Sequence, residues 1–193
     1  SEESQWNINY TAGLHMTSES SKLRDLEELR SSGYERDNFE RFVMNNNYYL
    51  PLLEGKLIHQ YDHRFASFEN VKREKRFGIK PGTHSPSEEQ KSNPNYHITP
   101  RYWISKEDMD EHIERRKLLS SWYISFRDVT NVISNFRTCV ACLCDHSAVN
   151  YTAPNIVLGL DKNINRGIAS LLFVSLMNSL PFDYVVKQKF YGA

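Results

Sequence analysis

The side chains of greatest chemical interest lie in the segment Leu50–Phe68, which reads LPLLEGKLIHQYDHRFASF. An apolar lead-in reaches a Gly-Lys step, and a dense series of polar residues follows it: Lys56, His59, Gln60, Asp62, His63 and Arg64. Side chains of these types bond to phosphates and to the edges of bases. A purely structural strand has little use for so many donors, so we treat the segment as a candidate binding site.

Basic residues continue beyond this segment. The charge-rich stretch Lys72–Arg76 follows it, and isolated arginines stand at positions 101, 127 and 137. Arg137-Thr138 begins an apolar run, and an arginine at the end of a strand is held rigidly enough to read a base. Two alternatives remain open: Glu74 suits a solvated charged loop, and a lone arginine at a strand end is often a structural ion pair.

Three clustered cysteines, Cys139, Cys142 and Cys144, invite a metal site. On a strand, alternation places Cys142 and Cys144 on one face and Cys139 on the other. Thiols from one strand cannot surround a tetrahedral metal without a second ligand pair, and the chain has no matching CxxC. We therefore expect a buried core strand and no metal.

Two further patterns resemble catalytic sites. Asn93-Pro94-Asn95-Tyr96 is superficially like the Asn-Pro-Pro-Tyr loop of amino-group DNA methyltransferases, but no apolar strand precedes it and the second proline is absent. Asp62 and His63 are neighbours on an expected strand and would point to opposite faces, so they cannot form a dyad there. No GxGxxG or Walker sequence is present. We expect no catalytic residue in this chain.

The composition allows one domain of ordinary size. The 193 residues carry 24 Lys+Arg and 24 Asp+Glu, so the net charge is zero and any basic face must be local. Clustered cysteines without a disulfide pattern favour a reducing, cytoplasmic setting. The apolar run Ile168–Phe182 is too short and too polar to span a membrane. We expect the chain to be a fragment of a longer protein.

The elements that position these residues alternate irregularly along the chain. In the first half we expect a strand or extended arm at Trp6–Met16 and a helix at Leu23–Arg30 that Thr17–Ser20 would cap and Gly33 would end. Two strands, Tyr48–Leu53 and Gly55–Phe68, should follow, and Leu57, His59, Tyr61 and His63 would share one face of the second.

The composition changes at Asn70–Pro100, which is rich in Gly, Pro, Ser and Asn and predicts an inserted loop with a short helix at Ser87–Lys91. Strands and helices then continue without a regular βαβ repeat, so the expected fold is α+β, with a mixed, mainly antiparallel sheet and flanking helices. The expected elements are strands at Arg101–Ile104, Trp122–Val129, Arg137–Cys144 and Asn155–Leu160, a turn or short helix at Thr130–Asn135, and helices at Lys106–Leu119 and Asn165–Leu180.

The stretch Tyr49–Phe68 resembles a stretch much like YLPLYEGKMIHQFDHRFATY in large bacterial restriction-modification proteins, which are adenine-specific DNA methyltransferases. Other segments match the same family in the same order: Leu14-His-Met-Thr17 is similar to its HMTNDS, and Pro100-Arg-Tyr-Trp-Ile104 to its PRYWV. Phe126-Arg-Asp-Val129 and Asn135-Phe-Arg-Thr138 are similar to FRDI…NERT, and Leu176–Lys189 resembles LNS…FDYVARQK. The similarity covers nearly the whole chain.

The resemblance implies a position and a role. The chain is similar to the C-terminal, TaqI-like specificity region of such proteins, a single target recognition domain spanning 1–193. The catalytic Asn-Pro-Pro-Tyr and the S-adenosylmethionine loop would belong to a preceding domain, so this fragment itself would need no cofactor and would not be an enzyme. Its partners would be double-stranded DNA and the methyltransferase domain of the same protein. A nuclease is fused to some members of the family.

A methyltransferase must flip its adenine out of the duplex, and something must hold the surrounding DNA. On this hypothesis His59, Gln60, His63 and Arg64 read bases or order the loop that does, as do Arg137 and Thr138. Better candidates for phosphate contacts are Lys56, Arg73, Lys75 and Arg76, and Arg101 completes the expected basic face. The alternative is a scaffold module that packs against the catalytic domain, in which the polar residues satisfy one another and touch no DNA.

Overall fold

The computed structural model describes residues 6–116, 122–130, 135–144, 148–161 and 163–191. Its strands form two sheets. The first has the order β1-β10-β7-β8, and all of its pairs are antiparallel. The second has the order β2-β6-β5-β4-β3, and a short strand, β9, joins β5 in parallel. The α+β class and the mainly antiparallel pairing are therefore confirmed, with two sheets where one was expected.

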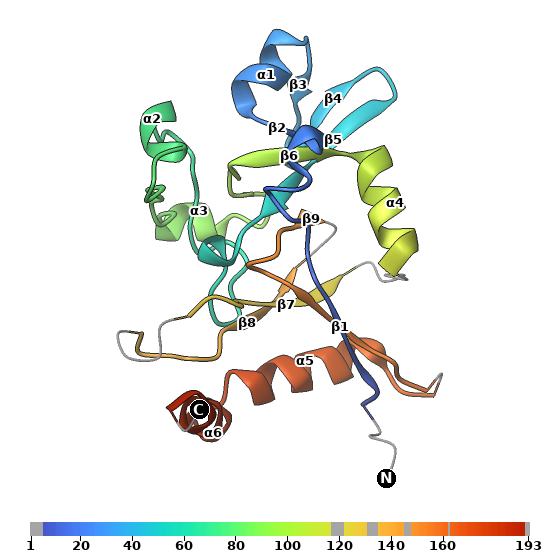
Figure 1. Cartoon of the computed structure of the whole chain (residues 1–193), viewed down its shortest axis with the longest axis vertical. Helices are drawn as coiled ribbons and strands as arrows, with labels where there is room; N and C mark the ends of the chain where they lie inside the picture. The colour runs from blue at the N-terminus through green and yellow to red at the C-terminus, as the bar shows by residue number, and fades with distance from the viewer. Residues whose placement is uncertain (1–5, 117–121, 131–134, 145–147, 162, 192–193) are drawn as a thin grey trace.

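Figure 1 shows the two sheets as an upper and a lower part, joined by several crossings of the chain. The lower sheet comprises β1 (Ile8–Thr11), β7 (Tyr123–Phe126), β8 (Ala141–Cys144) and β10 (Asn155–Leu158). The upper sheet comprises β2 (Leu23–Arg24), β3 (Glu35–Arg36), β4 (Phe42–Met44), β5 (Asn47–Leu53), β6 (Tyr102–Ser105) and β9 (Ala148–Val149). The helices are α1 (Leu26–Ser31), α2 (Arg73–Arg76), α3 (Glu88–Ser92), α4 (Lys106–Arg116), α5 (Arg166–Met177) and α6 (Leu180–Tyr191), with 3-10 turns η1 (Ser20–Lys22) and η2 (Gly55–Leu57).

Most local signals place their elements correctly. Ser105 begins α4, and its hydroxyl accepts the backbone N–H of Asp108 at 3.1 Å. Ser87 begins α3 with a capping box, as the short helix in the inserted loop requires. Gly33, at φ +84°, lies just past the end of α1. The predicted end of α4 at Leu119 lies outside the described residues, as does most of the turn at Thr130–Asn135.

The first helix begins later than the sequence predicts. Leu23 and Arg24 are not helical, because they pair with β6 as the edge strand β2. The cap is Asp25, whose side chain accepts from the backbone of Glu28 at 2.9 Å, and not a residue of Thr17–Ser20. Pairing with a neighbouring strand therefore outweighs the local capping signal.

The prediction of a strand over Gly55–Phe68 is wrong. The segment begins with η2, and His59 and Asp62 then form an isolated bridge around a tight turn in which Tyr61 has φ +61°. Long-range contacts account for this path. A Cβ on Gly55 would lie 2.3 Å from the carbonyl oxygen of Thr152, and Arg127 donates to the carbonyls of Gly55 and Ile58. These backbone groups are satisfied without a strand ladder.

The cysteines are confirmed as core residues. All three are buried and free. Cys142 and Cys144 pack in one apolar cluster with Leu57 and Phe68, with their sulfurs 3.6 Å apart. Cys139 belongs to a different cluster, which includes Phe173 of α5, so the two faces are those that strand alternation predicts.

The chain closes with two helices where one was expected. The side chain of Asn165 caps α5, α5 ends at Met177, and α6 begins three residues later. Within the part of the chain that the structure describes, no single helix is long and apolar enough to cross a membrane. Arg166–Met177 and Leu180–Lys189 meet the length and composition test only as a pair bent by 58°.

Candidate functional site

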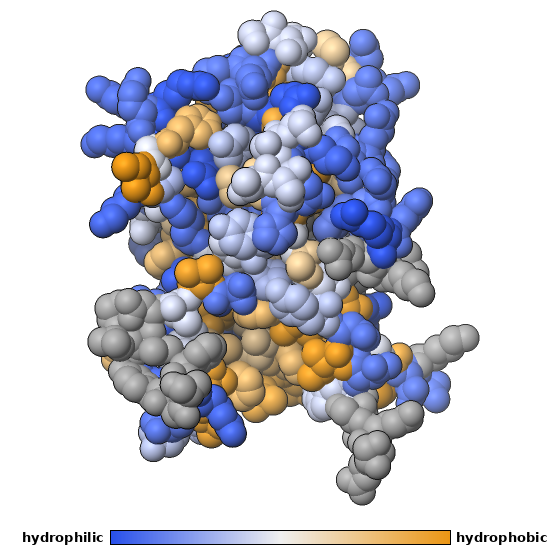
Figure 2. Space-filling model, viewed as in Figure 1, coloured by the Kyte–Doolittle hydropathy of each residue, from blue (hydrophilic) through white to orange (hydrophobic). Residues whose placement is uncertain are grey.

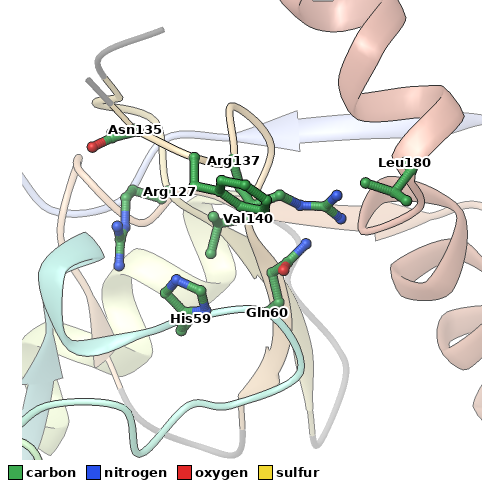
Figure 3. A pocket seen from close by; sticks show the side chains of 8 residues that line it. His59, Gln60, Arg127, Asn135, Arg137, Val140 and Leu180 are labelled. Atoms are coloured by element: carbon green, nitrogen blue, oxygen red, sulfur yellow. The ribbon is translucent and has the colours of Figure 1, made fainter. Parts of the chain in front are cut away.

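A pocket of about 450 Å³ lies where the turn after η2, the segments flanking β7 and β8, and the start of α6 come together (Figure 3). Its lining combines cationic, amide and aromatic side chains: His59, Gln60, Arg127, Asn135, Phe136, Arg137, Val140 and Leu180. The pocket thus joins three residues of the predicted DNA-binding set, His59, Gln60 and Arg137, from segments far apart in the sequence.

The turn that presents His59 and Gln60 is closed by its own backbone. The N–H of His59 donates to the Asp62 carbonyl at 2.7 Å, and the reverse bond is 3.1 Å. Tyr61 then donates its N–H to the carbonyl of Ala141 in β8 at 3.0 Å. The His59 ring stacks on Phe65, with 4.5 Å between the centroids. The turn is therefore fixed against the lower sheet, and its two polar side chains are held at the pocket.

Arg127 fixes this turn from the other side. It follows β7, and its Nε and Nη2 donate to the carbonyls of Gly55 at 3.0 Å and Ile58 at 2.6 Å. None of the ion pairs among the described residues involves Arg127. Its guanidinium positive charge is therefore met by carbonyl dipoles rather than by a carboxylate. In Figure 3 it points toward His59.

Arg137 provides a second cation on the far side of the pocket, near Leu180 (Figure 3). Its Nη2 donates to the backbone carbonyl of Asn178, which also accepts Gln60 Nε2 at 3.3 Å. Its Nε is buried and has no hydrogen-bond partner, and no carboxylate among the described residues forms an ion pair with it. The two arginines thus place positive charge without an ion-paired carboxylate on both sides of one pocket.

The junction of α5 and α6 positions this part of the lower sheet. The side-chain amide of Asn178 accepts the N–H of Ala141 at 3.0 Å and donates to the same residue's carbonyl at 2.8 Å. The carboxylate of Asp183 accepts the N–H groups of Thr138 and Cys139 at 2.8 and 2.7 Å. These two buried residues, on either side of the start of α6, anchor the residues that carry Arg137.

The arginines that line the pocket affect the pKa of His59. Burial lowers the pKa of His59, and the nearby charges of Arg127, Lys91 and Arg137 lower it further, against an opposing effect of Asp62. The lowered pKa favours the neutral form of His59, in which one ring nitrogen carries no proton. Burial also lowers the pKa of Arg127. An anion that enters the pocket would offset the positive potential that surrounds His59.

Phe136 projects into solvent beside these cations, with 92% of the residue exposed. An exposed aromatic ring at a pocket that two arginines also line offers a face on which a base can stack. Sequence reasoning assigned no role to Phe136 or Asn135, and it noted Arg127 without placing it in the site. The sequence Asn135-Phe-Arg-Thr138 could have indicated these residues, because an aromatic residue directly precedes Arg137 there.

Arg64 braces the structure. It donates to the carbonyls of Lys91, Asn93 and Tyr96 at 3.0–3.1 Å, so it ties the turn to the inserted loop. Asp62 accepts the N–H of Arg64 at 2.7 Å and pairs with Lys91 at 2.7 Å. His63 beside them is half-buried. These bonds form a structural network. Among the described residues, no group of three or more His, Cys, Asp or Glu lies close enough together to hold a metal ion.

The other predicted contacts lie apart from the pocket, and most have partners. Arg101 forms a buried ion pair with Glu54 at 2.7 Å, and Arg73 pairs with Asp25 at 2.8 Å. Lys56 donates to the Pro81 carbonyl at 3.1 Å. Arg76 and Thr138 are buried, whereas Lys75 is exposed.

The expected basic face is therefore divided. One part is the pocket around His59, Gln60 and Arg137. The other is a hollow of about 570 Å³ in the inserted loop, where Lys75 lies with Lys72 and His84. No family model, curated protein or solved structure matches this chain.

Proposed function

We propose that this chain is the DNA recognition portion of a site-specific adenine DNA methyltransferase of a restriction-modification system, and that it holds duplex DNA for a catalytic domain elsewhere in the same protein. The observation that carries the proposal is the pocket that joins Arg127, Arg137 and Phe136. Cations without carboxylate partners suit phosphate or guanine, and an exposed ring suits a base.

Each side chain has a distinct role in this proposal. Arg137, held by the Asn178 carbonyl, offers the guanidinium N–H groups other than its buried Nε to a base edge or a phosphate. Gln60 offers its amide oxygen, because its Nε2 is already bonded to Asn178. Phe136 stacks on a base or inserts at a base step. Lys72 and Lys75, both exposed, contact the backbone from the inserted loop.

The remaining parts of the proposal concern the parent protein. S-adenosylmethionine would bind the catalytic domain, and the present fragment would hold no cofactor. A protein that acts on genomic DNA works in the cytoplasm of a bacterium, where the three free, buried cysteines stay reduced. The full open reading frame should encode an Asn-Pro-Pro-Tyr motif upstream, and its absence would remove the family assignment.

The test is binding of the 193-residue chain to a mixed-sequence duplex at low salt, measured by fluorescence anisotropy or by NMR. Phe136→Ala should weaken binding by roughly 5- to 150-fold, since a stacked base contributes about 1–3 kcal/mol. Ile8→Ala is the control, because Ile8 is also an exposed apolar residue but lies on β1, at the edge of the lower sheet opposite β8. Unchanged affinity in Phe136→Ala would refute the role of the pocket.

A second variant tests the inserted loop. Replacing both Lys72 and Lys75 with Ala should reduce the slope of log K against log salt by about 1.8, because each phosphate that a lysine neutralises contributes about 0.9 to that slope. Arg73 and Arg76 are left intact, because the ion pair of Arg73 and the burial of Arg76 make their removal a test of folding instead.

The scaffold function is the second candidate, and the bonds of Arg64 favour it. The guanidinium of Arg64 donates to three backbone carbonyls, so it stabilises the fold without any contact to DNA. Under this function the chain would show no DNA-induced NMR shifts at millimolar concentration, and Phe136→Ala would leave every DNA measurement unchanged.

A further inference from the structure

Tyr61 has a backbone conformation that a tyrosine normally avoids. Its φ is +61°, in the left-handed region that is unfavourable for most L-residues. Tyr61 follows Gln60 in a two-residue turn, which the paired backbone bonds of His59 and Asp62 close. The second central residue of a tight turn with positive φ is normally glycine or asparagine. This turn would therefore form with less strain if position 61 held a smaller residue.

The other positions with positive φ show how the chain usually meets this requirement. Three of the other non-glycine examples among the described residues are asparagines: Asn7, Asn45 and Asn70. Asparagine tolerates the left-handed region because its short side chain can form local hydrogen bonds. The fourth is Glu40, whose carboxylate pairs with Arg36 and whose carbonyl accepts the indole N–H of Trp103 at 2.7 Å. Tertiary bonds therefore account for the conformation of Glu40.

The side chain of Tyr61 has no comparable role in the fold. Hydrophobic side chains gather on the lower part of the molecule in Figure 2, but 61% of Tyr61 is exposed. Among the described residues, Tyr61 packs in none of the hydrophobic clusters, no aromatic ring stacks on its ring, and no cation lies over it. Strained residues concentrate at sites that bind a ligand. The exposed ring is therefore a candidate for contact with a ligand.

The backbone of Tyr61 adjoins the pocket that carries the proposed DNA contacts. Gln60, directly before it, lines this pocket (Figure 3), and the N–H of Tyr61 donates to the carbonyl of Ala141 at 3.0 Å. Ala141 follows the lining residue Val140. Phe136 of the same pocket is 92% exposed. The pocket region therefore presents two exposed aromatic rings, and every base has a face on which such a ring can stack.

We propose that Tyr61 stacks on a base of the bound duplex, an inference that rests on the proposed function. The backbone bonds that join His59 to Asp62 and Tyr61 to Ala141 fix the turn before DNA binds. Less conformational entropy is then lost when the ring meets a base. A smaller residue would relieve the strain but would offer no aromatic face. If Tyr61 served the fold alone, a residue that tolerates positive φ would replace it without any loss of DNA affinity.

The test measures both the DNA affinity and the melting temperature of the 193-residue chain. Tyr61→Asn should weaken binding to a mixed-sequence duplex at low salt by roughly 5- to 150-fold, the range for one stacked base. The melting temperature of this variant should equal that of the wild-type chain or exceed it by up to about 4 °C, because asparagine tolerates positive φ. Tyr61→Phe keeps the aromatic face and should bind within about 2-fold of the wild-type affinity.

Tyr10→Asn is the matched control. Tyr10 is 59% exposed, but it lies on β1, at the edge of the lower sheet opposite β8. Its replacement should leave DNA affinity unchanged. NMR can observe the contact itself, with the ring protons of Tyr61 assigned from their absence in Tyr61→Asn. These resonances should shift upfield when DNA is added, because the ring current of a stacked base shields them.

Different results would overturn different parts of this reasoning. If Phe136→Ala weakens binding but Tyr61→Asn does not, the stacking role is wrong and the proposed function survives. If Tyr61→Phe loses as much affinity as Tyr61→Asn, the hydroxyl makes the contact and stacking is excluded. A much lower melting temperature in Tyr61→Asn, or an equal loss of affinity in Tyr10→Asn, would also contradict the proposal. A wild-type chain that does not bind the duplex would remove the proposed function and this inference together.

Discussion

Replacement of Asp183 should test how the segment that carries Arg137 is held in place, without changing a residue that lines the pocket. Asp183 lies in the first turn of α6, and its buried carboxylate accepts the backbone N–H groups of Thr138 and Cys139. Those residues lead directly from Arg137 into β8. Asp183→Ala removes both acceptor bonds at once and leaves two buried donors without a partner.

The expected cost follows from these two bonds. A buried donor without a partner costs about 1–3 kcal/mol, so Asp183→Ala should lose about 2–6 kcal/mol of unfolding free energy. That is a large part of the ~5–15 kcal/mol that a typical domain has. Asp183→Asn keeps an oxygen in place and loses the negative charge at the start of α6, so it should lose only about 1 kcal/mol.

The assay is urea unfolding followed by tryptophan fluorescence and, independently, by circular dichroism, so that coincident transitions justify a two-state analysis. Amide hydrogen exchange at Thr138 and Cys139 should rise in Asp183→Ala and stay slow in Asp183→Asn. The reasoning would be refuted if Asp183→Ala stayed within about 0.5 kcal/mol of the wild-type chain, or if the two variants were equally destabilised.

Three further predictions concern ionisable groups. Arg101→Ala should cost about 3–5 kcal/mol in urea unfolding, because it leaves Glu54 buried without its partner. Burial raises the pKa of Glu54, and Arg101 opposes that shift. In Arg101→Ala the folded state should therefore bind the proton of Glu54 more tightly than the unfolded state does. The free energy of unfolding should then fall as pH rises above about 4.5, whereas an acid with a lowered pKa makes it rise with pH. The pKa of Cys139 is raised to about 11, chiefly by burial, so its thiol should resist iodoacetamide at pH 8 until the chain unfolds. An NMR titration of His59 should give a midpoint below 6.5 that rises when DNA is added, whereas a midpoint that DNA leaves unchanged would contradict an anion in the pocket.

Local signals in the sequence predict the regular elements well. Alternation places Cys142 and Cys144 on one face of β8, and the structure puts both in the same cluster. Capping by Ser87 and Ser105 is decided within one turn of chain, so those helix starts could be read directly. In both cases the interacting atoms are separated by only a few residues.

The same kind of reasoning is wrong where distant residues decide the path. Alternation over Gly55–Phe68 suggested a strand, but Gly55 lies against the carbonyl of Thr152 and Arg127 takes the carbonyls that a strand would use. The Leu23–Arg24 edge strand is a similar case, because its partner β6 is about 80 residues away in sequence.

The sequence by itself determined which chemical groups are available and where most helices and strands lie, because residue type and periodicity act over a few neighbouring residues. Only the tertiary structure decided which groups meet. It directed Arg64 to backbone carbonyls and brought Gln60, Arg127 and Arg137 to one pocket beside Phe136. The physical reason is that a buried donor must find an acceptor, and the acceptor that the fold supplies can lie anywhere along the chain.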